Sequence, residues 1–244
     1  MDNKLIRYLK NLVSKSQIAI NISRPIYHVT LGKYQIGKMK KNFQENAFSV
    51  LQSFHQCMEE NSCFYTLAFG SLLGAVREKG FIKHDFDIDV YMWAEDYDPN
   101  LPEMLGKYGF KLTHEFEVAN GRLGREQTFE KNGIGIDIFY IYPPVSNLPY
   151  CCDFIFINEC TSFADQMKKN GGVVCRRLEL PFIKERELVP FEDFMIYIPK
   201  NAHELLSFRY GEDYMTPNPQ WTSGKTNEHI IVWHGNLGIY KENL

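Results

Sequence analysis

Asp85, Asp87 and Asp89 alternate with apolar residues in the segment DFDIDV. In a β-strand, residues two apart point to the same face, with Cα atoms roughly 6–7 Å apart. Three such carboxylates repel one another, which raises their own pKa values or destabilises the fold unless they have a partner. A divalent cation resolves this conflict, and ligands that are all oxygen suit a hard ion such as Mg²⁺ or Mn²⁺. The spacing therefore predicts a strand that binds a metal.

A fourth carboxylate, Asp137, lies in the apolar segment GIDIF, where a lone carboxylate would be costly to bury. If this segment is a strand that pairs beside the strand of Asp87, Asp137 completes a metal site with Asp87 and Asp89. Its expected work is to hold the metal or to accept a proton from an attacking hydroxyl.

A possible phosphate-binding turn precedes the aspartates. Gly70 allows a strand-to-helix turn to approach a phosphate closely, and the amides at the start of the following helix point at such an anion. Ser71 adds a hydroxyl, and the planar guanidinium of Arg77 suits a phosphate oxygen pair. These three residues are the predicted substrate-binding set.

Two other interpretations of the aspartates compete with a metal site. An exposed face on an edge strand explains the alternation, but it explains neither Asp137 nor the Gly-Ser turn. A calcium loop is the second, because the three aspartates match positions 1, 3 and 5 of an EF-hand and Asp96 falls at position 12. That loop requires glycine where this chain has Val90, and its other positions are too apolar here.

The composition is that of an ordinary globular protein. The chain has 244 residues, of which 44% are hydrophobic and 23% charged, enough for one large domain or for a domain with an appendage. A net charge of −3 argues against a nucleic-acid partner. The six cysteines include no Cys-x-x-Cys pair, and Cys151, Cys152 and Cys160 lack the usual spacing of zinc ligands. We expect reduced, mostly buried thiols in a cytoplasmic protein.

The elements that must position these residues follow from hydrophobic periodicity and turn residues. The pattern predicts a mixed β-sheet flanked by helices, an α+β fold. Beyond Pro143 the pattern is less regular, apart from one helix with a capping-box sequence, Asn201-x-x-Glu204. The expected helices are 42–61, 72–77, 98–108 and 201–210, and the expected strands are 63–69, 85–93, 110–118, 127–131 and 134–142.

Three segments make up the expected domain organisation: an N-terminal appendage over 1–40, a core over 41–145 and an extension of the same domain over 146–244. Leu5, Leu9 and Leu12 recur at helical spacing among basic residues, so residues 1–20 could contact an anionic membrane surface. Packing of this helix on its own domain is the alternative. The longest apolar run, Tyr65–Val76, is shorter than the ~20 residues of a spanning helix.

The motifs GSLLGAVR (70–77), GFI (80–82) and DFDID (85–89) together closely resemble the core motif of the LicD family, which includes bacterial phosphocholine transferases and is related to fukutin-type ribitol-phosphate transferases. The segment IDIF (136–139) resembles a later family motif. IPK (198–200) and RYG (209–211) resemble its C-terminal signature. The resemblance spans about residues 45–215 and is densest over 65–95.

This resemblance implies a nucleotidyltransferase-like fold of the polymerase-β superfamily. It implies metal-dependent transfer of a phospho-alcohol from a CDP-linked donor, with release of CMP. Phosphocholine is the first expectation for the transferred group. The implied acceptor is a hydroxyl of a surface glycan, such as lipopolysaccharide or capsule, or of its lipid-linked precursor, and the implied place is the cytoplasm at the inner membrane face.

Carried over onto this chain, the family motifs assign a role to each predicted site residue. By this resemblance, Gly70 and Ser71 form the phosphate-binding turn, and Arg77 supports the donor phosphates. The metal ligands and catalytic carboxylates fall on Asp87, Asp89 and Asp137, with Asp85 beside them.

The chain departs from the family pattern at two places: it has HDF (84–86) where Trp-Asp-Asp is common, and Tyr140 where proline is usual. Two other functions are compatible with these residues. A nucleotidyltransferase would use the same site on an NTP and release pyrophosphate, and a catalytically silent module would bind a carbohydrate or a protein. Tyr91, Trp93 and Trp221 could form a cage for choline, but their positions are ordinary for core packing, which we expect instead.

Overall fold

The computed structural model describes residues 32–83, 85–157, 160, 162–218 and 229–242. The chain divides into two units, Met1–Glu45 and Asn46–Leu244. All the predicted site residues belong to the second unit. The amphipathic segment expected over residues 1–20 lies outside the described residues.

Helices and strands alternate irregularly along the chain. The helices are α3 (Gly32–Glu60), α4 (Phe69–Arg77), the 3₁₀ helix η2 (Ala94–Asp96), α5 (Leu101–Gly106), α6 (Phe163–Asn170) and α7 (Ala202–Tyr210). The strands are β1 (Thr66–Leu67), β2 (Asp87–Trp93), β3 (Lys111–Val118), β4 (Gly124–Lys131), β5 (Ile134–Ile141), β6 (Tyr150–Ile155), β7 (Val173–Glu179), β8 (Arg186–Phe191), β9 (Phe194–Pro199) and β10 (Ile230–Glu242).

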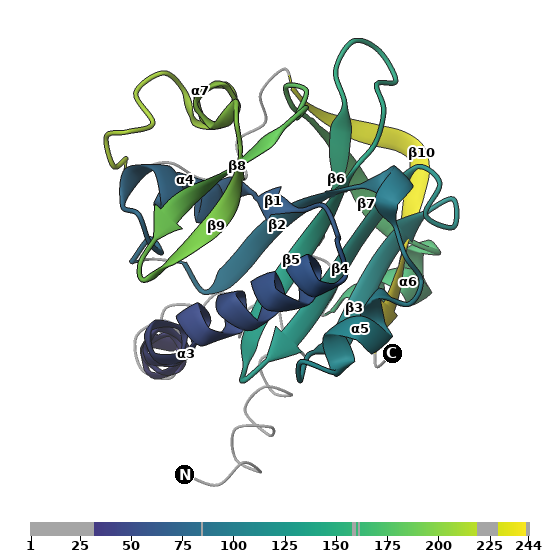
Figure 1. Cartoon of the computed structure of the whole chain (residues 1–244). Helices are drawn as coiled ribbons and strands as arrows, with labels where there is room; N and C mark the ends of the chain where they lie inside the picture. The colour runs from purple at the N-terminus through teal and green to yellow at the C-terminus, as the bar shows by residue number, and fades with distance from the viewer. Residues whose placement is uncertain (1–31, 84, 158–159, 161, 219–228, 243–244) are drawn as a thin grey trace, which may run out of the picture. The chain divides into compact units, whose positions relative to one another are not determined.

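An eight-stranded sheet with the order β1-β2-β5-β4-β3-β10-β7-β6 is the centre of the second unit, and β8 and β9 form a separate hairpin (Figure 1). Strands β2 and β5 run parallel, and the other neighbours in the large sheet are antiparallel. The mixed sheet with flanking helices confirms the expected α+β class.

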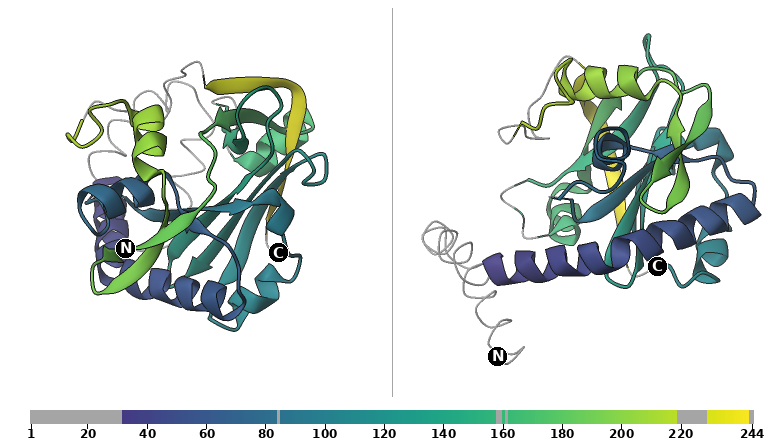
Figure 2. Two further views of the ribbon diagram at one scale, coloured as in Figure 1. Left: turned by 45° about the horizontal axis from the view of Figure 1, so that its top comes forward. Right: turned by 60° about the vertical axis from the view of Figure 1, so that its left-hand side comes forward.

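The two faces of the sheet differ in chemistry. Ile88 on β2 and Ile136 on β5 are opposite one another and fully buried, as is Phe129 on β4. The part of helix α3 that belongs to this unit covers this apolar face (Figures 1 and 2), and Lys131 Nζ on the same face donates to Ser53 Oγ of α3 at 2.8 Å. Because side chains alternate along a strand, the predicted carboxylates lie on the opposite face.

The passage from β1 into α4 differs from the expectation. The predicted strand 63–69 is reduced to Thr66–Leu67, and α4 begins at Phe69, so Gly70 and Ser71 lie in the first turn of the helix instead of before it. Phe69 has φ +40°, a conformation that L-residues rarely adopt. Its ring packs edge-on against Tyr91 and Phe139, with centroids 5.2 and 4.9 Å away, which supports this sharp turn.

Other boundaries were partly right. Strand β2 begins at Asp87, so Asp85 precedes the strand instead of belonging to it. Gly109 has φ +84° just after α5, as expected of a helix stop. At α7 the capping box is not formed as expected: Asn201 makes no side-chain bond to the backbone of the helix, and its Nδ2 donates to Glu204 Oε2 at 2.8 Å. The described residues beyond Pro143 include five strands, β6 to β10, that the sequence pattern did not predict.

No helix among the described residues combines the length and apolar character needed to cross a membrane.

Candidate active site

Three of the predicted carboxylates meet where β2 and β5 run side by side. The parallel register places Asp89 opposite Asp137, and Asp87 opposite Gly135. Asp87, Asp89 and Asp137 each offer one carboxylate oxygen, and these oxygens lie within 4.8 Å of one another. The strand pairing on which the predicted cluster depended is therefore present.

The start of α4 holds Asp89 in place. The amide of Ala68 donates to the Asp89 carbonyl at 2.9 Å, and the Asp89 amide donates to Ser71 Oγ at 3.0 Å. The Gly70 amide donates to the Asp89 carboxylate, at the helix end that favours negative charge. Ser71 is only 1% exposed, so its first task is to fix Asp89, and its contact with a phosphate stays a prediction.

Asp137 is held from the neighbouring strands. Thr128 Oγ1 on β4 donates to Asp137 Oδ1 at 2.5 Å, and His114 Nε2 on β3 lies 2.9 Å from the same hydroxyl. Burial lowers the pKa of His114, which favours its neutral form.

The electrostatics of the cluster favour a cation. Burial, followed by the charges of Asp87, Asp137 and Asp85, raises the pKa of Asp89 well above its usual range. Burial also raises the pKa of Asp137, to about 6, although the Thr128 hydrogen bond opposes the shift, and it raises the pKa of Asp87. No lysine or arginine of the described residues forms an ion pair with these three carboxylates. A set of oxygen ligands without a counter-charge fits a hard divalent ion.

Asp85 lies beside this cluster and faces a cleft of about 440 Å³. Burial, and then the charge of Asp87, raises its pKa to about 6, while the guanidinium of Arg77 opposes the shift. The cleft is lined by Gly70, Leu73, Arg77, Ile82, Asp85, Tyr210, Asp213, Tyr214, Thr216, Pro217 and Asn218.

Arg77, the last residue of α4, contributes its side chain to the same cleft. Its Nη2 pairs with Glu78 Oε1 at 2.9 Å, and its Nη1 reaches the carbonyl of Tyr214 at 3.5 Å. Its buried Nε has no hydrogen-bond partner within the part of the chain that the structure describes. Arg77 is therefore placed to meet an anion in the cleft.

Several residues near the cluster were missed from the sequence. Burial and the charge of Asp137 raise the pKa of Glu126 well above its usual range, and burial and the charge of Asp89 raise that of Tyr210. Glu126 and Thr128 alternate on β4, so their common face could have been inferred had the strand been started at Gly124. The proximity of Tyr210, at the end of α7, has no comparable signal in the sequence.

Other residues that the sequence singled out can be compared with the structure only where it describes them. Tyr140 points to the apolar face, where its hydroxyl donates to Gln127 Oε1 at 2.8 Å, so the departure from proline lies on the face of β5 opposite to Asp137. Tyr91 is 6% exposed, which agrees with core packing, while His84 and Trp221 lie outside the described residues. All six cysteines are free thiols, five of them buried, and the described residues bring no set of three cysteines into metal-binding geometry.

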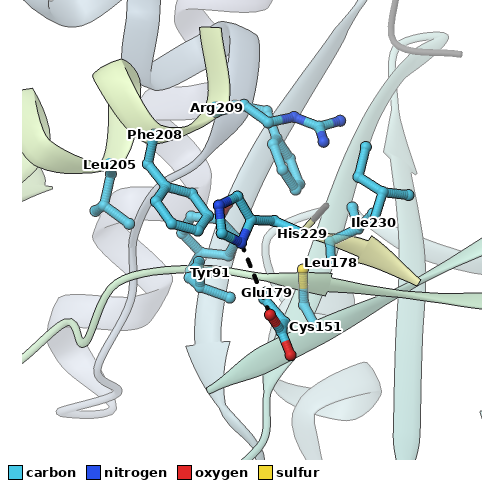
Figure 3. A pocket seen from close by; sticks show the side chains of 11 residues that line it. Tyr91, Cys151, Leu178, Glu179, Leu205, Phe208, Arg209, His229 and Ile230 are labelled. Carbon is cyan, nitrogen blue, oxygen red and sulfur yellow. Dashed lines mark ion pairs between the residues drawn. The ribbon is translucent and has the colours of Figure 1, made fainter. Parts of the chain in front are cut away.

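A second cavity, near Phe69 and Tyr91, is too small for a substrate. Its volume is about 20 Å³, room for one water molecule. Figure 3 shows His229 and Glu179 facing one another across it, with Nδ1 and Oε2 3.8 Å apart. Of these two cavities, only the cleft beside Asp85 has the size of a ligand pocket.

Comparison with known proteins places the chain in a family. A family model described as LicD/FKTN/FKRP, nucleotidyltransferase domain, matches residues 62–201, more than half of the chain. The chain therefore belongs to this family, and the resemblance noted in the sequence is confirmed. The match includes α4, the aspartate cluster and the β8–β9 hairpin.

Similar curated proteins include two named transferases. Over 188 residues the chain is 23% identical to ribitol-5-phosphate transferase FKTN of Mus musculus, a match that covers 73% of this chain and 35% of the mouse protein. Over 67 residues it is 47% identical to lipopolysaccharide cholinephosphotransferase LicD of Haemophilus influenzae, covering 28% of this chain and 23% of that protein. The chain thus spans about a third or less of the length of these relatives.

Proposed function

We propose that this protein is a metal-dependent transferase that moves a phospho-alcohol from a CDP-linked donor to a hydroxyl of a surface glycan or its lipid-linked precursor and releases CMP. The observation that carries the proposal is the convergence of Asp87, Asp89 and Asp137 at the start of α4, beside a cleft lined by Arg77 and Asp85. Membership of a family whose named members transfer ribitol phosphate and choline phosphate supports it. Of the possible phospho-alcohols, we put phosphocholine first.

The proposal includes a nucleotidyltransferase-like fold of the polymerase-β superfamily, which agrees with the wording of the matching family model. It also includes a cytoplasmic setting, with residues 1–20 at the inner face of a membrane. Mg²⁺ or Mn²⁺ would be held by Asp87, Asp89 and Asp137. When bound, such a metal neutralises charge on the donor diphosphate and on the departing CMP.

The residues of the chain share the remaining work. Arg77 binds phosphate oxygens of the donor in the cleft, and the first turn of α4 keeps Asp89 in position. The acceptor hydroxyl attacks the phosphorus that carries the alcohol, and Asp85 takes the hydroxyl proton. A carboxylate whose pKa is about 6 is well suited to that task near neutral pH. One oxygen–phosphorus bond forms, the bond to the bridging oxygen breaks, and CMP leaves with that oxygen.

CMP release tests the proposal. The purified chain is incubated with CDP-choline, CDP-ribitol, CDP-glycerol or CDP-ethanolamine, with Mg²⁺ or Mn²⁺, and donor binding is titrated in parallel. The Asp87→Asn/Asp89→Asn variant should lose turnover and metal-dependent binding, whereas Asp193→Asn, in the exposed β8–β9 turn, should keep both.

Release of pyrophosphate from an NTP would instead make the chain a nucleotidyltransferase that uses the same site. If no CDP-alcohol and no NTP is bound or turned over in the presence of metal, the enzyme proposal is wrong, and a carbohydrate- or protein-binding role becomes the better hypothesis.

A further inference from the structure

We infer that His114 is a positioning residue of the candidate metal site: through the Thr128 hydroxyl, it fixes which oxygen of Asp137 is available to a metal. The inference rests on the proposed function, because it concerns the same site. It adds His114 and Thr128 to the site, two residues that the sequence pattern did not indicate.

The contacts form a chain across three adjacent strands. His114 on β3 is opposite Thr128 on β4, which is opposite Asp137 on β5. The distances are 2.9 Å from His114 Nε2 to Thr128 Oγ1 and 2.5 Å from Thr128 Oγ1 to Asp137 Oδ1. The three side chains therefore point to the same face of the sheet and form a continuous hydrogen-bonded path.

The number of available hydrogens determines which group donates and which accepts in each hydrogen bond of this path. An ionised carboxylate only accepts, so the single hydroxyl hydrogen of Thr128 must be donated to Asp137 Oδ1. The Thr128 oxygen then accepts from His114, which requires a hydrogen on Nε2. With Oδ1 engaged in this way, Oδ2 is the oxygen of Asp137 left for a metal, and the carboxylate is held against rotation.

A β-bulge brings His114 into this position. The register between β3 and β4 shifts between Leu112 and His114: Leu112 is opposite Phe129, yet His114 is opposite Thr128. Without the extra residue, Thr113 would be opposite Thr128, and His114 would fall on the apolar face that α3 covers. Bulges are common next to active sites because they redirect a side chain. The irregularity here serves to direct the imidazole toward Asp137.

Packing then fixes the ring. His114 lies edge-on to Phe116, with centroids 5.5 Å apart, and is tilted against Tyr240 at 5.7 Å. Thr113 Oγ1 lies 3.3 Å from Nδ1 and 3.0 Å from the Thr128 carbonyl. Its single hydrogen can be donated to either, so it is compatible with an Nδ1 that accepts while Nε2 carries the ring hydrogen. The imidazole is thus packed against two aromatic rings and contacted at both nitrogens.

Binding of Mn²⁺ alone, without donor or acceptor, tests the inference. Thr128→Val keeps the shape of the side chain but has no hydroxyl, and His114→Phe keeps the aromatic packing but has no nitrogen. Each should weaken Mn²⁺ binding by about 10–100-fold, the usual effect of losing a partner of a metal ligand. Thr128→Ser and His114→Gln restore a hydroxyl and an N–H donor, and should recover most of the affinity.

The outcomes separate the inference from the proposed function. If the wild type binds Mn²⁺ and the Val and Phe variants bind it equally well, the inference is wrong and the metal site stands. If His114→Gln is as weak as His114→Phe while both stay folded in a thermal melt, an N–H donor at this position does not restore the metal site, and the inference is again wrong. If the wild type itself binds no Mn²⁺, the proposed metal site fails and the inference fails with it. Should Thr128→Val not fold, the His114 pair decides.

Nitrogen-15 NMR of the Mg²⁺-loaded protein gives a second measurement. His114 should be the neutral tautomer with hydrogen on Nε2. A neutral tautomer with hydrogen on Nδ1 would contradict the direction of the path.

Discussion

At Gly70, the space that a side chain would need is already occupied by Asp85. A Cβ built on Gly70 would lie 2.8 Å from Asp85 Oδ2, closer than real Cβ contacts. Gly70→Ala should therefore displace the Asp85 carboxylate while leaving α4 intact, because alanine is the better helix former. We expect CMP release to fall about tenfold or more, with no loss of thermal stability, since a small misplacement of a reacting group is costly.

Gly106→Ala in α5 is the matched control. Apart from its chain neighbours and the backbone of its own helix, no atom lies within 4 Å of the Cβ that it would introduce, so it should change neither activity nor fold. If Gly70→Ala is as active as Gly106→Ala, the close approach of Asp85 to Gly70 has no bearing on catalysis, and the role of Asp85 as proton acceptor is weakened.

Strands β3, β4 and β10 are joined on the apolar side of the sheet by a buried charge network. Arg125 Nη1 and Nη2 each lie 2.6 Å from a carboxylate, of Glu115 and of Glu117. Lys241 of β10 pairs with both glutamates, at 3.2 Å from Glu115, and Gln127 Nε2 donates to Glu115 Oε2 at 2.7 Å. The network attaches β10, the last strand along the chain, to the strands that position the site.

Arg125→Met should lower the free energy of unfolding by about 3–5 kcal/mol, because it leaves two buried carboxylates with the half-buried Lys241 as their one remaining cation in this network. Arg122 lies three residues away and is exposed. Arg122→Met should therefore lower the free energy of unfolding by less than about 0.5 kcal/mol. Urea unfolding of both variants measures the difference. Addition of Glu117→Gln to Arg125→Met should recover part of the loss, and equal stability of the two single variants would contradict a stabilising role for the network.

The sequence predicted the strands that can be recognised from the residue pattern of their own segment. The alternation of Asp87 and Asp89 with buried residues identified β2, and the lone Asp137 in an apolar run identified β5, so the cluster could be inferred once their pairing was assumed. The insertion of β10 between β3 and β7 could not, because it depends on contacts between distant parts of the chain. The bulge that directs His114 is equally hidden, since one residue of shift exchanges the faces of a strand.

For the whole molecule, the site carboxylates should make the metal-free protein less stable as the pH rises. Asp85 and Asp137 have pKa values of about 6 in the folded chain against an ordinary value of 3.8. Between about pH 4 and 6 the folded state therefore holds protons that the unfolded state has released, and stability falls with rising pH. The expected loss between pH 4.5 and 7.5 is about 4 kcal/mol, roughly 2 kcal/mol from each of these two groups, or roughly 8–16 °C in melting temperature.

A divalent metal should reverse this trend, because it binds the ionised carboxylates and so stabilises the folded state at pH 7.5 more than at pH 4.5. Thermal melts with Mn²⁺ or with a chelator, at both pH values, measure the effect. The Asp137→Asn side chain stays neutral at every pH, so without metal this variant should be more stable than the wild type at pH 7.5. Mn²⁺ should raise its melting temperature less than it raises that of the wild type. A variant that is less stable than the wild type at pH 7.5 in the presence of chelator would show that the Asp137 carboxylate is satisfied by the protein itself, and the electrostatic case for a metal would fall.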